Sequence, residues 1–147
     1  MENVPQSVIV GLGLGGATAF FFFIANLYVI LHFLQKLIFP KRQFKWLNSM
    51  GKRWHYVHYF GNIIAIVLAL IHGILMLPYA SFWHWVLIIL LLWMGFAGFI
   101  LRFTKASANV KKVLRNLHAK WYMFVIILVV LIVAHIASLP NFPFPLE

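Results

Sequence analysis

The chain has 147 residues, of which 64% are hydrophobic and 10% are charged, and its formal net charge is +10. Soluble domains are about half apolar and about a quarter charged, so this composition excludes an ordinary soluble domain. There is no cysteine, which excludes disulfides, cysteine-ligated iron–sulfur clusters and covalently attached c-type haem. The two acidic residues, Glu2 and Glu147, lie one at each end, which excludes catalysis by paired carboxylates.

Four apolar segments are each long enough to span a bilayer, which takes about 20 residues. They cover about residues 7–35, 54–77, 82–103 and 118–138. Their apolar runs are continuous rather than alternating, which favours helices over a transmembrane β-barrel. Pro40 and Pro78 fall in connections, where proline does not interrupt a helix. We therefore predict an all-α membrane protein, in which residues 1–147 form a single bundle of four transmembrane helices.

The positive charges predict how this bundle is oriented. All twelve Lys and Arg residues lie in two stretches, 36–53 and 102–120, and the connection at 78–81 has none. The positive-inside rule places both basic stretches in the cytoplasm and both chain termini outside. We expect an integral protein of a prokaryotic cytoplasmic (inner) membrane.

The glycines from Gly11 to Gly16 match the G-x-G-x-x-G pattern of dinucleotide-binding loops. That motif needs an acidic residue about 20 positions further on, and this chain has none between its two ends. We interpret Gly11 and Gly15 instead as small residues that allow close packing of a membrane helix.

Two of the apolar segments each carry a pair of histidines, His58 with His72 and His118 with His135. Imidazole inside hydrocarbon is costly, so such residues indicate a function. The second and fourth segments run in the same direction, which brings one histidine of each to the inner face and one toward the outer face. Two neutral imidazoles can ligate a haem iron from opposite sides. We predict haem between the second and fourth helices, with His58 and His118 as the inner iron ligands and His72 and His135 as the outer ones.

The histidine spacing leaves one ligand open. His58 and His72 are 14 residues apart, which is two heptads and places both on one helix face. The two histidines of the fourth segment are 17 residues apart and differ by about 50° of rotation. His55, also 17 residues before His72, is the alternative inner ligand. His32 and His84, near segment ends, are weaker candidates for a quinone pocket or a proton path.

Glycine and arginine residues support the predicted site. Gly61 and Gly73 follow the two histidines of the second segment and would leave space for a flat macrocycle, although glycine is also common in membrane helices. Arg53 and Arg115 lie near the inner histidines and could pair with haem propionates or anionic lipid. The outer end has no cation, which counts against a second haem or indicates a partner that supplies one.

The stretches Trp54–Gly61 and Leu70–Gly73 resemble the His-x13-His helix of four-helix cytochrome b proteins and of the transmembrane core of ferric reductase-like proteins. The second histidine pair occupies the partner position, with a longer spacing, and the resemblance covers about residues 50 to 138. It implies b-type haem with two histidine ligands and electron transfer across or within the membrane. The flavin and nicotinamide domains that accompany ferric reductase cores are absent from this sequence.

These observations together favour transmembrane electron transfer through one or, in our preferred interpretation, two b haems. With both axial positions filled by histidine, the iron has no open site for a substrate. We expect an electron-transfer subunit of an oxidoreductase complex rather than an independent enzyme, with other subunits, the lipid bilayer and quinone as partners, and no nucleic acid. Two alternatives stay open, a free-standing membrane oxidoreductase for quinone or a small oxidant, and a haem-free helical scaffold subunit.

Overall fold

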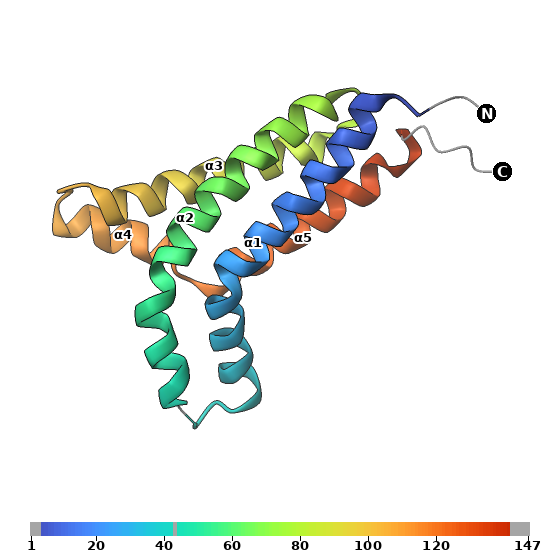
Figure 1. The fold of residues 1–147 in the computed structure, drawn as a ribbon. Coiled ribbons are helices and arrows are strands. Elements are labelled where there is room, and N and C mark those ends of the chain that lie inside the picture. Colours follow the sequence, from blue (N-terminus) through green and yellow to red (C-terminus); the bar gives the residue numbers. More distant parts are fainter. Residues whose placement is uncertain (1–3, 43, 142–147) are drawn as a thin grey trace.

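The computed structural model describes residues 4–42 and 44–141, and these contain helices and no strand. The long helices are α1 (Gln6–Ile38), α2 (Lys45–Leu75), α3 (Phe82–Phe103), α4 (Ala108–His118) and α5 (Trp121–Ser138) (Figure 1). Two short 3-10 helices, η1 (Leu77–Tyr79) and η2 (Leu139–Asn141), follow α2 and α5.

Four of the helices, α1, α2, α3 and α5, are long and apolar enough to cross a membrane. Their outward surfaces carry large hydrophobic side chains, of which Phe20, Phe82 and Ile89 are 61%, 73% and 66% exposed. A surface of this kind is unfavourable in water, whereas the acyl chains of a bilayer solvate it well. The prediction of an all-helical fold with four helices of membrane-spanning length and apolarity is therefore confirmed for the described residues.

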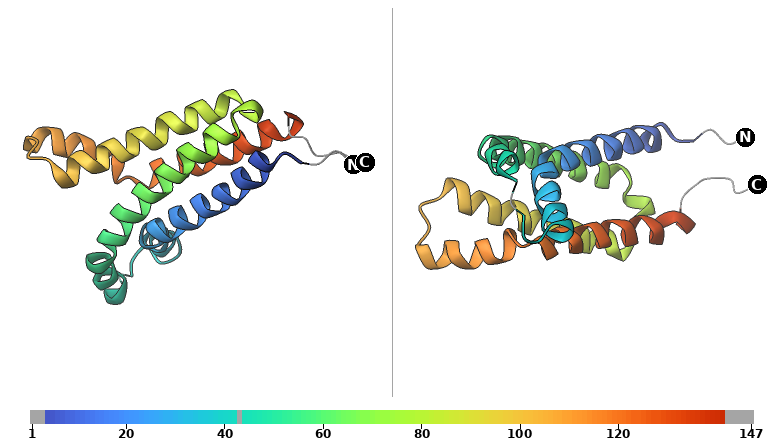
Figure 2. Two further views of the ribbon diagram at one scale, coloured as in Figure 1. Left: turned by 45° about the horizontal axis from the view of Figure 1, so that its top comes forward. Right: turned by 90° about the horizontal axis from the view of Figure 1, so that it is seen from below.

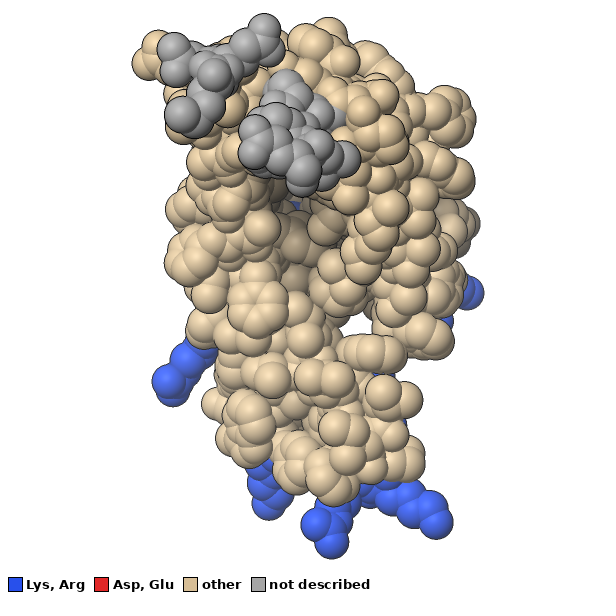
Figure 3. Space-filling view, turned by 90° about the vertical axis from the view of Figure 1, so that its right-hand side faces the viewer, with Lys and Arg blue, Asp and Glu red and all other residues tan. Residues whose placement is uncertain are grey.

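The helices form two units that lie side by side. In the first, α1 and α2 pack as an antiparallel hairpin, and in the second, α3 packs against α4 and α5 (Figures 1 and 2). The start of α1 and the end of α5 lie together at what we call the terminal end (Figure 1). Residues 36–53 and 102–120 define the opposite, basic end. Figure 3 shows Lys and Arg side chains mostly at the bottom and at the lower and middle edges of the face it views.

The bounds of two predicted segments are corrected by the structure. α2 begins at Lys45 rather than near residue 54, because its first turns mix apolar and polar residues and so lack a continuous apolar run. The fourth segment does not begin at His118, which is the last residue of α4. Lys120 has an extended backbone, with φ −86° and ψ 134°, so the chain turns before α5 starts at Trp121. α4 itself had been predicted as part of a connection, and it carries the cations Lys111, Lys112 and Arg115.

Small residues bring α1 and α2 into close contact. A Cβ atom built on Gly61 would lie 2.8 Å from the Cβ of Ala25, and one built on Gly11 would lie 2.6 Å from the sulfur of Met76. Close backbone approach at small residues is a usual way to pack membrane helices, and this was the role predicted for Gly11. Gly61, in contrast, was expected to leave space for a macrocycle, and it lies instead on the face of α2 that contacts α1.

Candidate functional site

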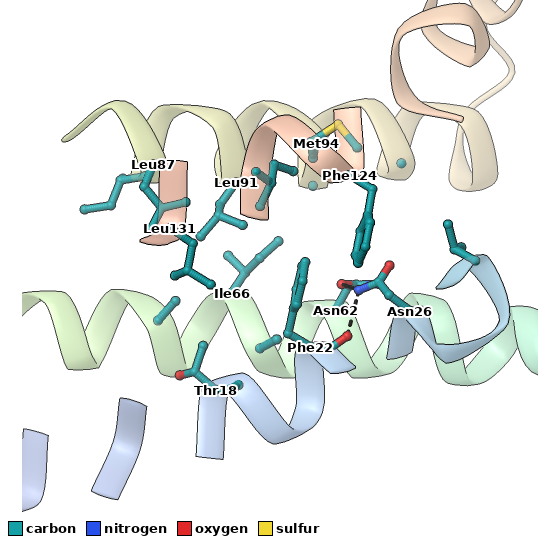
Figure 4. A pocket seen from close by; sticks show the side chains of 18 of the residues that line it. Thr18, Phe22, Asn26, Asn62, Ile66, Leu87, Leu91, Met94, Phe124 and Leu131 are labelled. Carbon is teal, nitrogen blue, oxygen red and sulfur yellow. Dashed lines mark hydrogen bonds between the residues drawn. The ribbon is translucent and has the colours of Figure 1, made fainter. Parts of the chain in front are cut away.

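A cavity of about 1680 Å³ lies between the α1–α2 hairpin and the α3–α5 unit. Most of its wall is apolar, as Figure 4 shows for Ile66, Leu91, Phe124 and their neighbours. Pockets for one drug-sized molecule have about 300–1,000 Å³, so this cavity has room for more than one such group. All four histidines of the two predicted pairs line it.

The histidines face each other across this cavity in the predicted pairs. His58 of α2 and His118 of α4 form the basic-end pair, with ring centroids 6.2 Å apart and ring planes at 79°. His72 of α2 and His135 of α5 form the terminal-end pair, with centroids 6.4 Å apart and planes at 8°. A bond from a metal to an imidazole nitrogen is about 2 Å and the ring centre lies about 1 Å beyond it, so two axial imidazoles have centroids about 6 Å apart. Both pairs therefore have the separation that a shared metal requires.

The terminal-end pair has both rings fixed by backbone carbonyls. Nδ1 of His72 lies 2.7 Å from the carbonyl oxygen of Gly11, and Nδ1 of His135 lies 2.8 Å from that of Leu131. A carbonyl can only accept, so Nδ1 donates its proton in both rings and Nε2 keeps a free lone pair. This is the usual arrangement of histidines that bind metals, in which the second nitrogen is held by an acceptor.

The basic-end pair is held less firmly. Nδ1 of His58 lies 3.2 Å from the carbonyl oxygen of Ala25 and 3.2 Å from the amide nitrogen of Asn62. Nδ1 of His118 is buried and has no hydrogen-bond partner among the described residues. Burial, followed by the neighbouring His58, lowers the pKa of His118, while the nearby carbonyl of Met94 acts in the opposite direction. This shift favours the neutral imidazole, which is the form that binds a metal.

One histidine in each pair rests against a glycine of a neighbouring helix. A Cβ atom on Gly15 of α1 would lie 2.9 Å from Cε1 of His72, and one on Gly98 of α3 would lie 3.2 Å from Cε1 of His118. Gly73, for which the sequence predicts a role beside a macrocycle, lines the cavity, and an added Cβ would have Ile88 as its neighbour, at 3.8 Å. The sequence pointed to Gly15 for helix packing only, and it gave no signal for Gly98.

His55, the alternative inner ligand, lies apart from the main cavity. Its Nδ1 contacts the carbonyl of Lys52, its ring centroid is 4.1 Å from that of Tyr56, and it lines a separate pocket of about 170 Å³. It is His58, one turn further along α2, that faces His118. The break between α4 and α5 explains why the 17-residue spacing of the second pair does not prevent this pairing, since His118 and His135 do not share one helix.

The cations that line the cavity all lie at its basic end, and they are Lys36, Arg115 and Lys120. Arg115 therefore lies where the sequence predicted it. Arg53 is exposed and does not line the cavity. Arg102, another residue of the basic end, lies over the ring of Tyr59, 5.5 Å from its centroid, and Tyr59 is part of the cavity wall.

The two weaker candidates, His32 and His84, also line the cavity. His32 lies beside Tyr28, with ring centroids 5.6 Å apart. Nδ1 of His84 accepts a hydrogen bond of 3.1 Å from the backbone N–H of Ser81 and so helps to cap α3. Its ring centroid is 5.3 Å from that of His135. His84 is thus a capping residue that adjoins the terminal-end pair.

Two amides in the middle of apolar segments, the buried Asn26 of α1 and the half-buried Asn62 of α2, were not predicted as part of the site. The side-chain nitrogen of Asn26 donates to the carbonyl of Phe22 at 2.8 Å and to the side-chain oxygen of Asn62 at 2.9 Å. Asn26 is only 7% exposed. Their signal was present in the sequence, because polar amides in the middle of apolar segments require partners.

The donor set fits haem better than a bare metal ion. Within residues 4–42 and 44–141, no three His, Asp or Glu side chains converge in a way that could hold a metal ion. Two opposed imidazoles suit a metal whose remaining ligands are supplied by a cofactor, as the porphyrin of haem supplies them to iron. The large apolar cavity and the cations at one end suit a flat apolar group with acidic substituents.

No model of a known protein family matches the chain, and comparisons with curated proteins and with solved structures find no similar protein.

Proposed function

We propose that the chain is a membrane electron-transfer protein that holds b-type haem between two pairs of histidines, His58 with His118 and His72 with His135. The observation that carries this proposal is the pair of opposed imidazoles at each of two levels of one apolar cavity, with centroids 6.2 and 6.4 Å apart. Isolated packing histidines have no reason to repeat the same separation at two levels.

The residues of the chain have distinct parts in this proposal. The Nε2 atoms of the four histidines would bind the iron, and carbonyls such as those of Gly11 and Leu131 orient the rings. Haem, when bound in this way, supplies an iron that exchanges single electrons and has no open position for a substrate. Apolar side chains of the cavity wall exclude water, and Arg115 and Lys120 would pair with acidic substituents at the basic end.

Two centres at different depths would form a path through the membrane. His58 and His72 are separated by 14 residues of α2, which is about 21 Å along a helix. Moving one electron across the whole membrane potential changes its energy by about 2.3 kcal/mol per 100 mV. The direction of transfer would therefore matter to energy conservation.

A path of this kind needs an electron donor and an acceptor, and we propose that they are other subunits of a membrane redox complex, with quinone as a further partner. The cations of the basic end support docking of an acidic redox subunit, because a concentrated charge of one sign steers a complementary partner.

The test is the haem content and the spectrum of the purified chain. A pyridine haemochrome assay should give non-covalent haem b at about two per chain. His72→Ala and His135→Ala should remove the same spectral component, and His58→Ala and His118→Ala should remove the other. His55→Ala is the matched control and should retain both components.

Two outcomes would contradict the proposal. A chain that stays colourless when it is produced with ample haem would favour the haem-free scaffold. A content near one haem per chain, lost only with His58 or His118, would limit the site to the basic-end pair, where the cations lie.

A further inference from the structure

Two amides form a chain of hydrogen bonds that ends at His58. Asn26 donates both to the Phe22 carbonyl of its own helix, at 2.8 Å, and to the side-chain oxygen of Asn62, at 2.9 Å. Figure 4 shows the two amides together beside the cavity, with the bond to Phe22 dashed. Because the oxygen of Asn62 is held by Asn26, the NH2 group of Asn62 must point the other way. It lies 2.7 Å from the carbonyl oxygen of His58 and 3.2 Å from Nδ1 of the same residue.

Nδ1 of His58 thus lies between an acceptor and a donor at the same distance. The carbonyl of Ala25, at 3.2 Å, favours a proton on Nδ1, which leaves Nε2 free as a ligand. The NH2 group of Asn62, also at 3.2 Å, favours an unprotonated Nδ1, which moves the ring proton to Nε2. A protonated Nε2 cannot bind a metal, so the position of one proton decides whether His58 can act as a ligand.

The terminal-end pair has no such competition. Nδ1 of His72 and Nδ1 of His135 each have a carbonyl at 2.7 and 2.8 Å, and neither has an amide donor among the hydrogen bonds of the described residues. These two rings are therefore set in the form that binds a metal, whereas His58 has one contact that favours this form and one that favours the other.

We propose that Asn26 and Asn62 are positioning residues that keep the proton of His58 on Nε2 in the empty protein, so that ligand binding at the basic-end pair requires this proton to move to Nδ1. The terminal-end pair needs no such step. The position of the His58 proton is a property of the protein without a ligand. The proposal rests on the proposed function only in taking haem as the ligand.

The proton position can be measured directly in protein prepared without haem. Two-bond nitrogen–proton NMR correlations of ¹⁵N-histidine-labelled protein distinguish Nδ1–H from Nε2–H, and His58→Ala assigns the signal. We expect Nδ1–H for His72 and His135, and Nε2–H for His58. Asn62→Leu removes the donor and should convert His58 to Nδ1–H.

A second variant, Asn26→Leu, should also move the His58 proton to Nδ1, and it keeps the test possible if Asn62→Leu does not fold. Asn26→Leu releases the oxygen of Asn62, which can then turn toward His58 and accept from Nδ1–H. The matched control is Thr18→Val, because Thr18 also lines the cavity, and among the described residues its hydroxyl donates to the carbonyl of Leu14 of its own helix, at 2.8 Å. Thr18→Val should leave the His58 signal unchanged. Nδ1–H at His58 in the unaltered chain, or the same shift with Thr18→Val, would overturn the proposal.

A haem titration tests the consequence for binding. Changes to groups that orient a ligand alter metal affinity by about 10–100-fold. We expect Asn62→Leu to raise the haem affinity of the site that contains His58 by up to about tenfold, and to leave the haem affinity of the site that contains His72 unchanged. An unchanged or lower haem affinity at the His58 site would overturn the proposed effect of Asn62 on binding. If no haem binds to any variant, the proposed function fails, while the NMR result still decides the role of the two amides.

Discussion

His72 and His135 hold their rings almost parallel, with 8° between the planes, whereas the rings of His58 and His118 are nearly perpendicular, at 79°. Parallel axial imidazoles donate into the same iron d orbital and split the d levels strongly, while perpendicular ones leave them nearly degenerate. We predict two distinct low-spin signals in the electron paramagnetic resonance spectrum of the oxidised protein. The rhombic signal should vanish with His135→Ala, and the highly anisotropic one with His118→Ala. Two identical signals would show that the ring planes change when haem binds.

Gly15 should be essential for the terminal-end pair. An added Cβ would lie 2.9 Å from Cε1 of His72, so this ring has to shift in Gly15→Ala. Displacing an axial ligand should lower haem affinity at this pair by about tenfold or more. Gly13→Ala is the control, since its Cβ meets no atom within 4 Å. Equal loss in both variants would mean that the helix, and not the contact with His72, is responsible.

Gly98 should have the corresponding role at the other pair. The Cβ added in Gly98→Ala would lie 3.2 Å from Cε1 of His118, which is a milder clash. We therefore expect haem affinity to fall by only a few-fold, and only at the basic-end pair. Gly73→Ala, with a nearest contact of 3.8 Å, should have little effect on that component. A loss of the His72–His135 component in Gly98→Ala would contradict the assignment.

The orientation in the membrane can be tested with single cysteines, because the chain has none of its own. Pro78, between α2 and α3, and Asn109, in α4, are both exposed. The distribution of Lys and Arg predicts that Pro78→Cys reacts with an impermeant reagent added to whole cells, whereas Asn109→Cys reacts only after the membrane is opened. The reverse pattern would invert the predicted topology.

The proposed partnership predicts a hetero-oligomer. Mild detergent extraction from the source membrane, native electrophoresis and peptide identification should find the chain with other redox subunits. If docking uses the basic end, electron transfer from a soluble acidic donor should slow steeply as ionic strength rises. A lone monomer or homodimer that passes electrons from a quinol to an acceptor would favour the free-standing oxidoreductase instead.

The sequence predicted the features that depend on composition and spacing along one helix. Membrane-spanning length follows from continuous apolar runs, and α3 has the predicted bounds, Phe82–Phe103. The face shared by His58 and His72 follows from helical periodicity within α2. The start of α2 and the whole of α4 lack a continuous apolar run and were missed, although α4 has apolar residues at helical spacing, Val110, Val113, Leu114 and Leu117.

Contacts between helices were decided only by the tertiary structure. Which of His55 and His58 faces His118 depends on the turn at Lys120, and no proline or glycine marks that turn in the sequence. Gly61 and Gly15 both occur in apolar helices, yet one packs against Ala25 and the other against His72, because each faces a different neighbour. The link from Asn26 to Asn62 joins residues 36 positions apart. A sequence specifies the faces of its own helices, whereas the rotation and approach of two helices are set by the packing of all side chains between them.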